Sequence, residues 1–325
     1  MEAASIPPGS LPRTRHVGDR VGDGLLYGLT ALASIVGILV VFAIVWRVAD
    51  GAWPAIKFFK FGFVYRNVWN VNLNGGSFGA RDLIIGTVVT SFGAMLLSGP
   101  ISIAIGLFLS ELAPPAVRAP VGTLIDMLAA VPSVVIGLWG IYVLAPFDAD
   151  HLAPGIHAVL GWIPIFGGDP HTESTVFTAI IVLTIMTIPI TSSICRELFI
   201  GVPSELEEGA IGLGATRWEM VKTVVVPSVR GGVVAAIILG LGRALGEAIA
   251  VTQVIGNFIP MSRSLFGSGD TMASRLANQY QGASTDRQIA ALIYLALVLL
   301  VITFITNYAA QRVVKRFELQ RTGGV

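Results

Sequence analysis

Two charged residues lie inside a long apolar stretch in the C-terminal half of the chain. Arg243 and Glu247 interrupt a run, 231–262, that is otherwise uncharged. An arginine at the centre of a bilayer costs about 2.5–3.5 kcal/mol on insertion scales, so its presence there requires an explanation. Its planar guanidinium can bind a tetrahedral oxyanion through two parallel hydrogen bonds. On a continuous helix, a spacing of four residues would place both side chains on one face, roughly 6 Å apart along the axis.

Two interpretations of this pair remain open. In the first, Glu247 partly neutralises Arg243 and the ion pair holds helices together, although buried ion pairs often stabilise a protein no better than apolar residues do. In the second, both residues line the path of an anion, and the carboxylate limits how tightly the anion is held. Ser133, which follows Pro132 in another apolar run, is a further candidate, because broken helices in transporters often mark the substrate route.

Other reactive groups give little support for catalysis. The chain contains one cysteine, Cys195, which excludes an internal disulfide framework and a thiolate metal cluster. His151, His157 and His171 fall in one predicted loop, but their spacing matches no standard metal site. The sequence Gly-x-x-x-x-Gly-Lys-Ser/Thr, which would bind the phosphates of ATP, does not occur. We therefore predict a protein that is not an enzyme and has no metal site or cofactor of its own.

Composition defines the class of protein that must position these residues. Of 325 residues, 54% are hydrophobic and only 13% are charged, whereas an ordinary soluble domain carries about 25% charge. The apolar residues form runs of about 20 or more, long enough to cross roughly 30 Å of hydrocarbon as helices. Helices are favoured because lipid offers no partner for exposed backbone groups. The net charge of +1 gives no reason to expect nucleic acid as a partner.

The predicted fold is an all-α polytopic membrane protein with six transmembrane helices. The apolar runs that define these helices are Leu25–Trp46, Leu83–Leu109, Val121–Pro146, Thr175–Cys195, Val229–Ile259 and Ile289–Ala310. The chain then divides into four parts. These are an N-terminal tail (1–23), a first transmembrane helix (24–48), a core of five transmembrane helices (83–312) and a C-terminal tail (313–325).

Charge in the connecting segments predicts the orientation. Lys and Arg are modestly more frequent on the side of both termini, and such residues prefer the cytoplasmic side of a membrane. Both termini are therefore predicted to be cytoplasmic. The segments 48–82, 147–174 and 260–288 would then lie outside, and we expect them to act as docking or gating loops.

The segment 203–227, between the fourth and fifth predicted spans, has the pattern of a helical hairpin. Ser204-Glu-Leu-Glu207 and Thr216-Arg-Trp-Glu219 both fit a capping box, in which the two side chains satisfy backbone N–H groups reciprocally. Gly212-Leu-Gly214 should end the first helix between them. The hairpin is either an interfacial anchor for the bundle or a coupling element presented to a cytoplasmic partner.

The second helix of this hairpin is expected to be short. It should end before Pro227, because proline removes a backbone donor and clashes with the preceding turn. Trp218, Val221 and Val225 would lie on one face of it.

The hairpin resembles the EAA signature of ABC importer permeases. In this chain Glu208-Gly-Ala-Ile-Gly-Leu-Gly214 is followed, after nine residues, by Val224-Val-Val226-Pro227. The spacing is that of the signature, with Gly209 in place of the first alanine and valines in place of isoleucine and leucine. Glycine at that position weakens a helix by about 0.5–1 kcal/mol relative to alanine. In the family, this loop seats in a cleft of the ATPase subunit.

Further segments narrow the resemblance to the PstC family of phosphate permease subunits. They are Leu239-Gly-Leu-Gly-Arg243-Ala-Leu-Gly-Glu247, the continuation Ala250-Val-Thr-Gln-Val-Ile-Gly-Asn257, and Asp126-Met-Leu-Ala-Ala-Val-Pro132-Ser133. The likeness extends over roughly 65–315, and the chain departs from the family at Ala248 and Gln253.

The resemblance implies a type I ABC importer permease that carries inorganic phosphate across the bacterial inner membrane. Its implied partners are a second permease subunit (PstA-like), an ATPase dimer (PstB-like) that binds ATP and Mg²⁺, and an external phosphate-binding protein (PstS-like). The residues predicted to line the substrate path, from their charge in the membrane or their place beside a proline, are Arg243, Glu247 and Ser133. The residues that the resemblance assigns to ATPase coupling are Glu207, Glu208, Gly214, Thr216 and Arg217. Sulfate or molybdate as the cargo, and a stand-alone secondary transporter, remain as alternatives.

Overall fold

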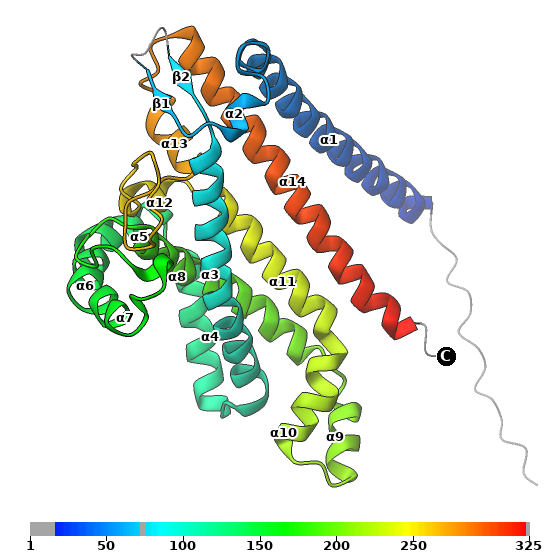
Figure 1. The fold of residues 1–325 in the computed structure, drawn as a ribbon. Coiled ribbons are helices and arrows are strands. Elements are labelled where there is room, and N and C mark those ends of the chain that lie inside the picture. The colour runs from blue at the N-terminus through cyan, green and yellow to red at the C-terminus, as the bar shows by residue number, and fades with distance from the viewer. Residues whose placement is uncertain (1–16, 72–75, 323–325) are drawn as a thin grey trace, which may run out of the picture. The chain divides into compact units, whose positions relative to one another are not determined.

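The computed structural model describes residues 17–71 and 76–322, and these are mostly helical (Figure 1). Six segments of the described chain are long and apolar enough to span a membrane. These segments are Gly22–Phe59, Arg81–Leu112, Ser133–Leu160, Val176–Ile200, Arg217–Gly246 and Asp286–Arg312. The prediction of an all-α polytopic protein with six transmembrane helices is therefore confirmed, although the predicted limits differ and the third and fifth spans are shifted along the chain at both ends.

The chain divides into two compact units, 1–50 and 51–325. In the first unit the described residues form one helix, the greater part of α1 (Val17–Phe59). Its large apolar side chains from Leu25 to Trp46 are exposed, as expected of a helix that faces lipid. Because this helix begins at Val17, part of the predicted tail is helical, whereas 1–16 lie outside the described residues.

The second unit begins with a small aromatic subdomain. It contains the last turns of α1, the short helix α2 (Gly62–Tyr65) and the antiparallel pair β1 (Trp69–Asn70) and β2 (Ser77–Phe78). Phe63 is buried and stacks on Tyr294 of the last helix, α14 (Asp286–Thr322), with the ring centroids 4.5 Å apart. This part of the predicted outer loop is thus packed against the bundle by a core of its own.

The centre of the second unit is a close pair of helices, α3 (Arg81–Leu107) and α8 (Val176–Ile200). Glycine allows the close approach: a Cβ atom on Gly93 would lie 2.9 Å from Ile180 Cδ1, and one on Gly106 would lie 2.9 Å from Cys195 Cβ. Small residues at such crossings are typical of helix packing in membranes, where van der Waals contact drives association. Helix α11 (Val226–Gly246) packs against both.

The third predicted span has the wrong limits. Helix α4 (Pro115–Ala129) ends before Pro132, whose backbone is extended, and a new helical segment begins at Ser133. That segment runs to Leu160 through α5 (Ser133–Trp139), α6 (Ala145–Phe147) and α7 (Ala153–Leu160), which are joined by π-helical turns. Proline cannot supply the N–H that a continuous helix requires, so one hydrophobic run contains parts of two helices.

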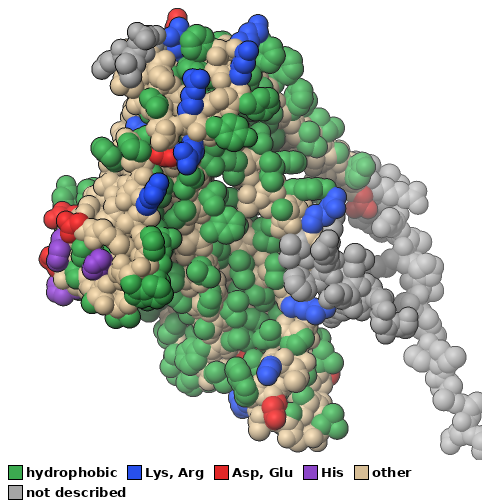
Figure 2. Space-filling view, in the orientation of Figure 1, with side chains coloured by type: hydrophobic (Ala, Val, Ile, Leu, Met, Phe, Trp, Pro, Cys, Tyr) green, Lys and Arg blue, Asp and Glu red, His purple; other side chains and the backbone are tan. Residues whose placement is uncertain are grey.

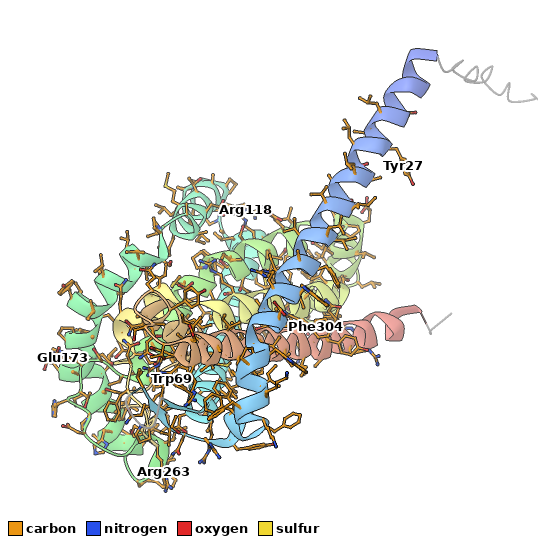
Figure 3. The ribbon with its side chains drawn as sticks, turned by 90° about the horizontal axis from the view of Figure 1, so that it is seen from above. Tyr27, Trp69, Arg118, Glu173, Arg263 and Phe304 are labelled. Carbon is orange, nitrogen blue, oxygen red and sulfur yellow. The ribbon has the colours of Figure 1, made fainter. Side chains whose placement is uncertain are left out.

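The two ends of residues 51–322 are chemically different. The hairpin of α9 (Ser204–Gly212) and α10 (Arg217–Met220) forms one end, and β1, β2 and α13 (Met272–Gln279) lie at the other (Figure 1). On the face drawn in Figure 2, hydrophobic side chains cover the middle, and Lys and Arg gather at the end with β1, β2 and α13. Figure 3 looks onto this second end, where Trp69 and Arg263 come from different segments.

Three further elements complete the second unit. Pro164–Phe166 forms a 3₁₀ turn after α7. Helix α12 (Ile249–Val254) follows α11, and the long helix α14 (Asp286–Thr322) ends the described chain. The predicted second tail, 313–325, is therefore helical as far as Thr322.

Candidate functional site

The glycine turn of the coupling hairpin, which we define as 203–227, is formed as predicted. Helix α9 ends at Gly212, and Gly214 has a φ of +90°. Residues with a Cβ rarely adopt this left-handed conformation, so glycine is the residue that suits the position. A Cβ atom on Gly214 would meet nothing within 4 Å, so the requirement for glycine is conformational and not a matter of space.

One of the two predicted capping boxes exists. The Thr216 N–H donates to Glu219 Oε2 at 2.8 Å, and the Glu219 N–H donates to Thr216 Oγ1 at 3.3 Å. The box at Ser204 is wrong, because α9 begins at Ser204 itself and its N-cap is Pro203, which forms no side-chain cap. Ser204 is therefore already within the first turn, one position too late to act as the cap.

The second helix of the hairpin does not end before Pro227. Helix α10 continues through a π-helical turn, Val221–Val225, into α11, and Pro227 occupies the first turn of α11. The missing N–H of proline is best tolerated in such a first turn. The segment Arg217–Gly246 is consequently one helical rod, 30 residues long, which connects the hairpin directly to Arg243.

The buried face of this rod differs from the predicted one. Val221 and Val225 are buried in a cluster with Cys195 and Phe199 of α8, as expected of an anchoring face. Trp218, predicted on the same face, is 72% exposed. A large exposed aromatic side chain beside a helical turn is the kind of residue that contributes most to protein interfaces.

Carboxylates surround the start of the hairpin. Burial raises the pKa of Glu207, and the neighbouring carboxylates of Glu111 and Glu208 raise it further. Arg217 donates from Nη1 to the carbonyl oxygen of Glu111 at 3.4 Å. Four of the five predicted coupling residues thus belong to one polar cluster or to the capping box, while Gly214 provides the turn between the two helices.

The apolar run that carries Arg243 and Glu247 is not a continuous helix. Helix α11 ends at Gly246, and Glu247 has an extended backbone, with φ −70° and ψ 119°. The Ala250 N–H donates to Glu247 Oε1 at 3.4 Å, so the carboxylate acts at the beginning of α12. The predicted arrangement of both side chains on one helical face is therefore wrong, and no ion pair joins them in the described chain.

Both residues nevertheless line one cavity, of about 600 Å³. Arg243 is exposed to this cavity, and within residues 17–71 and 76–322 its guanidinium makes no hydrogen bond or ion pair. A guanidinium in this state presents a planar fork of N–H donors, which matches two oxygen atoms of a tetrahedral anion. The chemistry of Arg243 therefore suits an oxyanion, and its place on the substrate path stays a prediction.

The same cavity contains a polar residue that the sequence analysis missed. Asn307 of α14 lines it opposite α11, and a Cβ atom on Gly242 would lie 3.4 Å from Asn307 Oδ1. Glycine at 242 therefore leaves room for the amide. The available signal was a single amide inside the uncharged part of the last predicted span.

Ser133 lies elsewhere. It is half-buried at the first position of α5 and does not line the cavity of Arg243. Helix α5 packs on α12, where a Cβ atom on Gly137 would lie 2.9 Å from the Ala250 Cα. The two broken helices therefore meet, but this structure does not place Ser133 beside Arg243. Its role in the substrate path stays a prediction.

Comparison with known proteins identifies the class. The family described as "Binding-protein-dependent transport system inner membrane component" matches residues 102–319. The phosphate transport system permease protein PstC of Pasteurella multocida (strain Pm70) is 39% identical over 309 residues, 94% of this chain and 95% of that protein. PstC of Mesorhizobium japonicum is 37% identical, and the match covers 93% of this chain and 92% of that protein. PstC 2 of Mycobacterium tuberculosis is 42% identical over 246 residues, which are 73% of this chain and 74% of that protein.

Solved structures agree on the fold. A bacterial alginate ABC transporter in complex with its alginate-bound periplasmic protein has a chain with a TM-score of 0.60 at 20% identity, covering 93% of this chain and 99% of that one. A chain of the inward-facing MetNI methionine ABC transporter gives a TM-score of 0.54 at 16% identity, covering 73% and 95%.

Fold, spans and family match together define a multi-pass inner-membrane permease subunit of a binding-protein-dependent ABC transport system, and not a catalytic subunit. Within that class, the chain belongs to the PstC family of permease proteins.

Proposed function

We propose that this chain is a permease subunit of an ATP-driven importer of inorganic phosphate. The observation that carries the proposal is the guanidinium of Arg243, which has no partner among the described residues and faces a cavity of about 600 Å³ directly beside a helix break. Broken helices with unpaired charge are typical of substrate sites in transporters, since an intramembrane charge without a function is a net cost. The names of the relatives above support phosphate as the cargo.

In this proposal Arg243 binds the anion, while Glu247 shapes the turn between α11 and α12. Asn307 supplies a neutral amide to the same cavity. A single arginine with one nearby carboxylate binds a doubly charged anion only moderately, which suits a site that must also release it.

The coupling hairpin would transmit the energy of ATP. Trp218, Glu208 and Leu213 are exposed around the Gly214 turn and would contact the ATPase, which binds ATP and Mg²⁺. Because Arg217–Gly246 is one helical rod, a displacement of the hairpin reaches Arg243 without an intervening loop. Closure of the ATPase dimer would then switch the cavity between its inward- and outward-facing states.

The complete importer would contain a second permease subunit (PstA-like), an ATPase dimer (PstB-like) and an external phosphate-binding protein (PstS-like). The hairpin and both termini would be cytoplasmic, and the end with β1, β2 and α13 would face the binding protein. The gathering of Lys and Arg at that end (Figure 2) suits a partner that delivers an anion.

Two alternatives differ in a measurable way. A sulfate or molybdate importer would keep the same subunits and change the solute, whereas a secondary transporter would need no ATPase. The reconstituted complex of both permeases, the ATPase dimer and the binding protein should hydrolyse ATP faster when the binding protein is loaded with phosphate. Stimulation by sulfate or molybdate alone would assign another cargo, and uptake without any ATPase would support the secondary transporter.

A further inference from the structure

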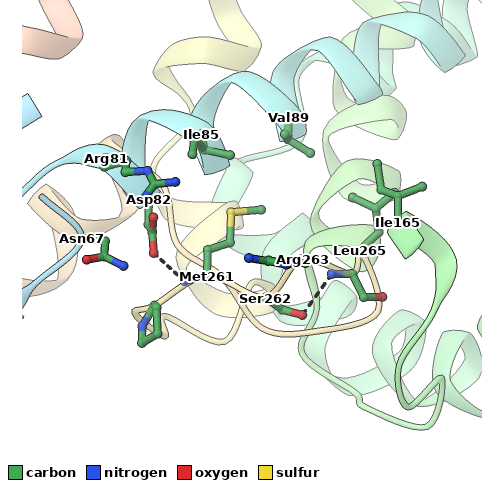
Figure 4. A pocket seen from close by; sticks show the side chains of 12 residues that line it. Asn67, Arg81, Asp82, Ile85, Val89, Ile165, Met261, Ser262, Arg263 and Leu265 are labelled. Atoms are coloured by element: carbon green, nitrogen blue, oxygen red, sulfur yellow. Dashed lines mark hydrogen bonds between the residues drawn. The ribbon is translucent and has the colours of Figure 1, made fainter. Parts of the chain in front are cut away.

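A second cavity, of about 380 Å³, lies at the end of α3 away from the coupling hairpin (Figure 4). Arg81, in the first turn of α3, lines one side of it, and Arg263, in the loop after α12, lines the other. Both arginine side chains are exposed. Asn67 and Ser262 also line the cavity. Four residues with hydrogen-bond donors therefore surround one space, and they come from three separate segments of the chain.

Neither arginine is paired with a carboxylate in the described residues. In the part of the chain that the structure describes, neither guanidinium makes a hydrogen bond or an ion pair. The one carboxylate in the lining, Asp82, is buried and accepts a hydrogen bond from the Met261 N–H at 3.0 Å, which holds the loop against α3. Two like charges in one cavity disfavour each other, and a bound anion would relieve this repulsion.

The neutral donors complete the chemistry. Ser262 Oγ accepts from the Ser264 N–H at 3.1 Å, which leaves its own hydroxyl hydrogen available to the cavity. Asn67 is exposed and can offer its amide N–H groups. Together with the two guanidinium groups, these donors suit the several oxygen atoms of a tetrahedral oxyanion, and the volume leaves room for part of its hydration water.

The position of this cavity relates it to Arg243. Gly240 of α11 packs beside Met95 of α3, and Met95 is 14 residues, or about 21 Å of helix rise, from Arg81. Helix α11 runs from the coupling hairpin toward the end of the bundle at which α3 begins with Arg81. Arg243 is therefore about 4.5 Å closer to that end than Gly240 is. The two levels are therefore separated by about 16 Å along the bundle, with the cavity of Arg81 and Arg263 nearer the end with β1, β2 and α13.

We propose that Arg81 and Arg263 form a receiving site for inorganic phosphate, which holds the hydrated anion after its release from the binding protein and before it reaches Arg243. This inference rests on the proposed function. The site has a net charge of +1 when Asp82 is ionised, so it would concentrate the anion without trapping it.

The test uses the complete complex in proteoliposomes, with the double variant Arg81→Gln, Arg263→Gln. Uptake of radiolabelled inorganic phosphate and ATP hydrolysis stimulated by the loaded binding protein are measured in the same vesicles and normalised to assembled complex. We expect uptake to fall roughly tenfold, as for loss of charge-assisted hydrogen bonds. ATP hydrolysis, and the concentration of binding protein that half-stimulates it, should not change.

A matched control variant also removes two positive charges from the end of the bundle with β1, β2 and α13. Lys60→Gln, Arg66→Gln takes away two exposed positive charges that do not line the cavity, and its uptake should equal that of the wild type. The variant Arg81→Lys, Arg263→Lys keeps the charge without the planar fork, so its uptake should fall between the two.

Three outcomes separate the explanations. Uptake by the glutamine double variant equal to that of the control would remove the receiving site while leaving the proposed function intact. A higher half-stimulating concentration of binding protein, in parallel with lower uptake, would overturn the site in favour of a protein-docking role for the arginines. A wild-type complex that takes up no phosphate would overturn the proposed function, and the receiving site with it.

Discussion

Arg243 and Glu247 face the same cavity although they lie on different sides of a helix break. Helix α11 ends at Gly246, and Glu247 accepts a hydrogen bond from Ala250 at the start of α12. A continuous helix would have brought the two side chains onto one face. The break instead separates them: Glu247 accepts a backbone hydrogen bond, and within the described residues the Arg243 guanidinium has no protein partner, as the proposed anion site requires.

The role of Glu247 can be separated from its charge. Glu247→Gln keeps a side-chain oxygen that can accept from the Ala250 N–H, whereas Glu247→Leu removes it. We therefore expect the glutamine variant to retain a substantial part of phosphate uptake, and the leucine variant to lose several-fold more, because the loss of this hydrogen bond costs about 1 kcal/mol. Uptake into vesicles, per assembled complex, measures both. Equal loss in the two variants would assign the effect to the negative charge.

The turn at Gly214 should be essential for ATPase binding. Gly214→Val forces a branched side chain into a φ of +90°, at a cost of about 1–3 kcal/mol. We expect weaker association with the ATPase and slower uptake, with membrane insertion unaffected. Co-purification with the tagged ATPase measures the association.

Gly209→Ala is the matched control for that variant. Gly209 lies within α9, and a Cβ atom there would also meet nothing within 4 Å. Alanine should stabilise the helix by about 0.5–1 kcal/mol and preserve ATPase binding. A Gly214→Val complex that still co-purifies with its ATPase and transports at the normal rate would remove the coupling role of the turn.

Acidification should strengthen the first helix of the hairpin. Burial and the carboxylates of Glu111 and Glu208 raise the pKa of Glu207 above its ordinary value of 4.5. A group with a raised folded-state pKa contributes stability that is present at low pH and is lost as the pH rises through that pKa. Amide exchange in α9, corrected for its intrinsic rate, should therefore slow as the pH is lowered from neutral toward the ordinary value of 4.5.

Two variants test whether Glu207 causes this pH dependence of amide exchange in α9. Glu207→Gln should abolish this pH dependence, while Glu205→Gln, in the same turn, should leave it unchanged. The prediction fails if wild type and Glu207→Gln show the same dependence.

A buried ion pair should stabilise the outer end. Arg275 is 6% exposed, and its Nη2 lies 2.5 Å from Asp270 Oδ2. Its guanidinium carbon lies 5.8 Å from the ring centroid of Trp69. Arg275→Leu would leave the buried carboxylate of Asp270 without its counter-charge, so we expect the free energy of unfolding to fall by about 3–5 kcal/mol. Thermal unfolding of the purified complex, compared between wild type and variant, measures this loss of stability.

The pH dependence of that variant has a defined sign. Burial already raises the pKa of Asp270, and the attraction of Arg275 opposes the rise. Without Arg275 the folded-state pKa rises further, so the variant should regain stability as the pH falls. The double variant Asp270→Leu, Arg275→Leu should lose less than the single one, and an equal or larger loss would contradict the account.

The sequence predicted those features that depend on local chemistry. The spans follow from long uncharged runs, the turn from Gly214, and the second cap from Thr216 and Glu219, because each property is carried by residues close together in the chain. The PstC resemblance was equally visible, since its motifs are continuous.

Features that depend on how helices meet were not predictable in this way. Hydropathy does not distinguish one helix from two that join at Pro132, nor does it reveal the break at Glu247, where tertiary packing of α12 replaces the continuation of α11. The exposure of Trp218 and the place of Asn307 in the cavity follow from the path of neighbouring helices. The first capping box failed because Pro203 set the start of α9 one residue early.

The most direct test of the account is phosphate uptake by Arg243 variants in proteoliposomes that contain the complete complex, normalised to assembled protein. We predict that Arg243→Gln abolishes uptake and that Arg243→Lys impairs it by about tenfold or more, because an ammonium lacks the planar fork. Assembly with the ATPase should remain normal in both. Near-normal uptake by the double variant Arg243→Leu, Glu247→Leu would contradict the proposal that the anion passes Arg243.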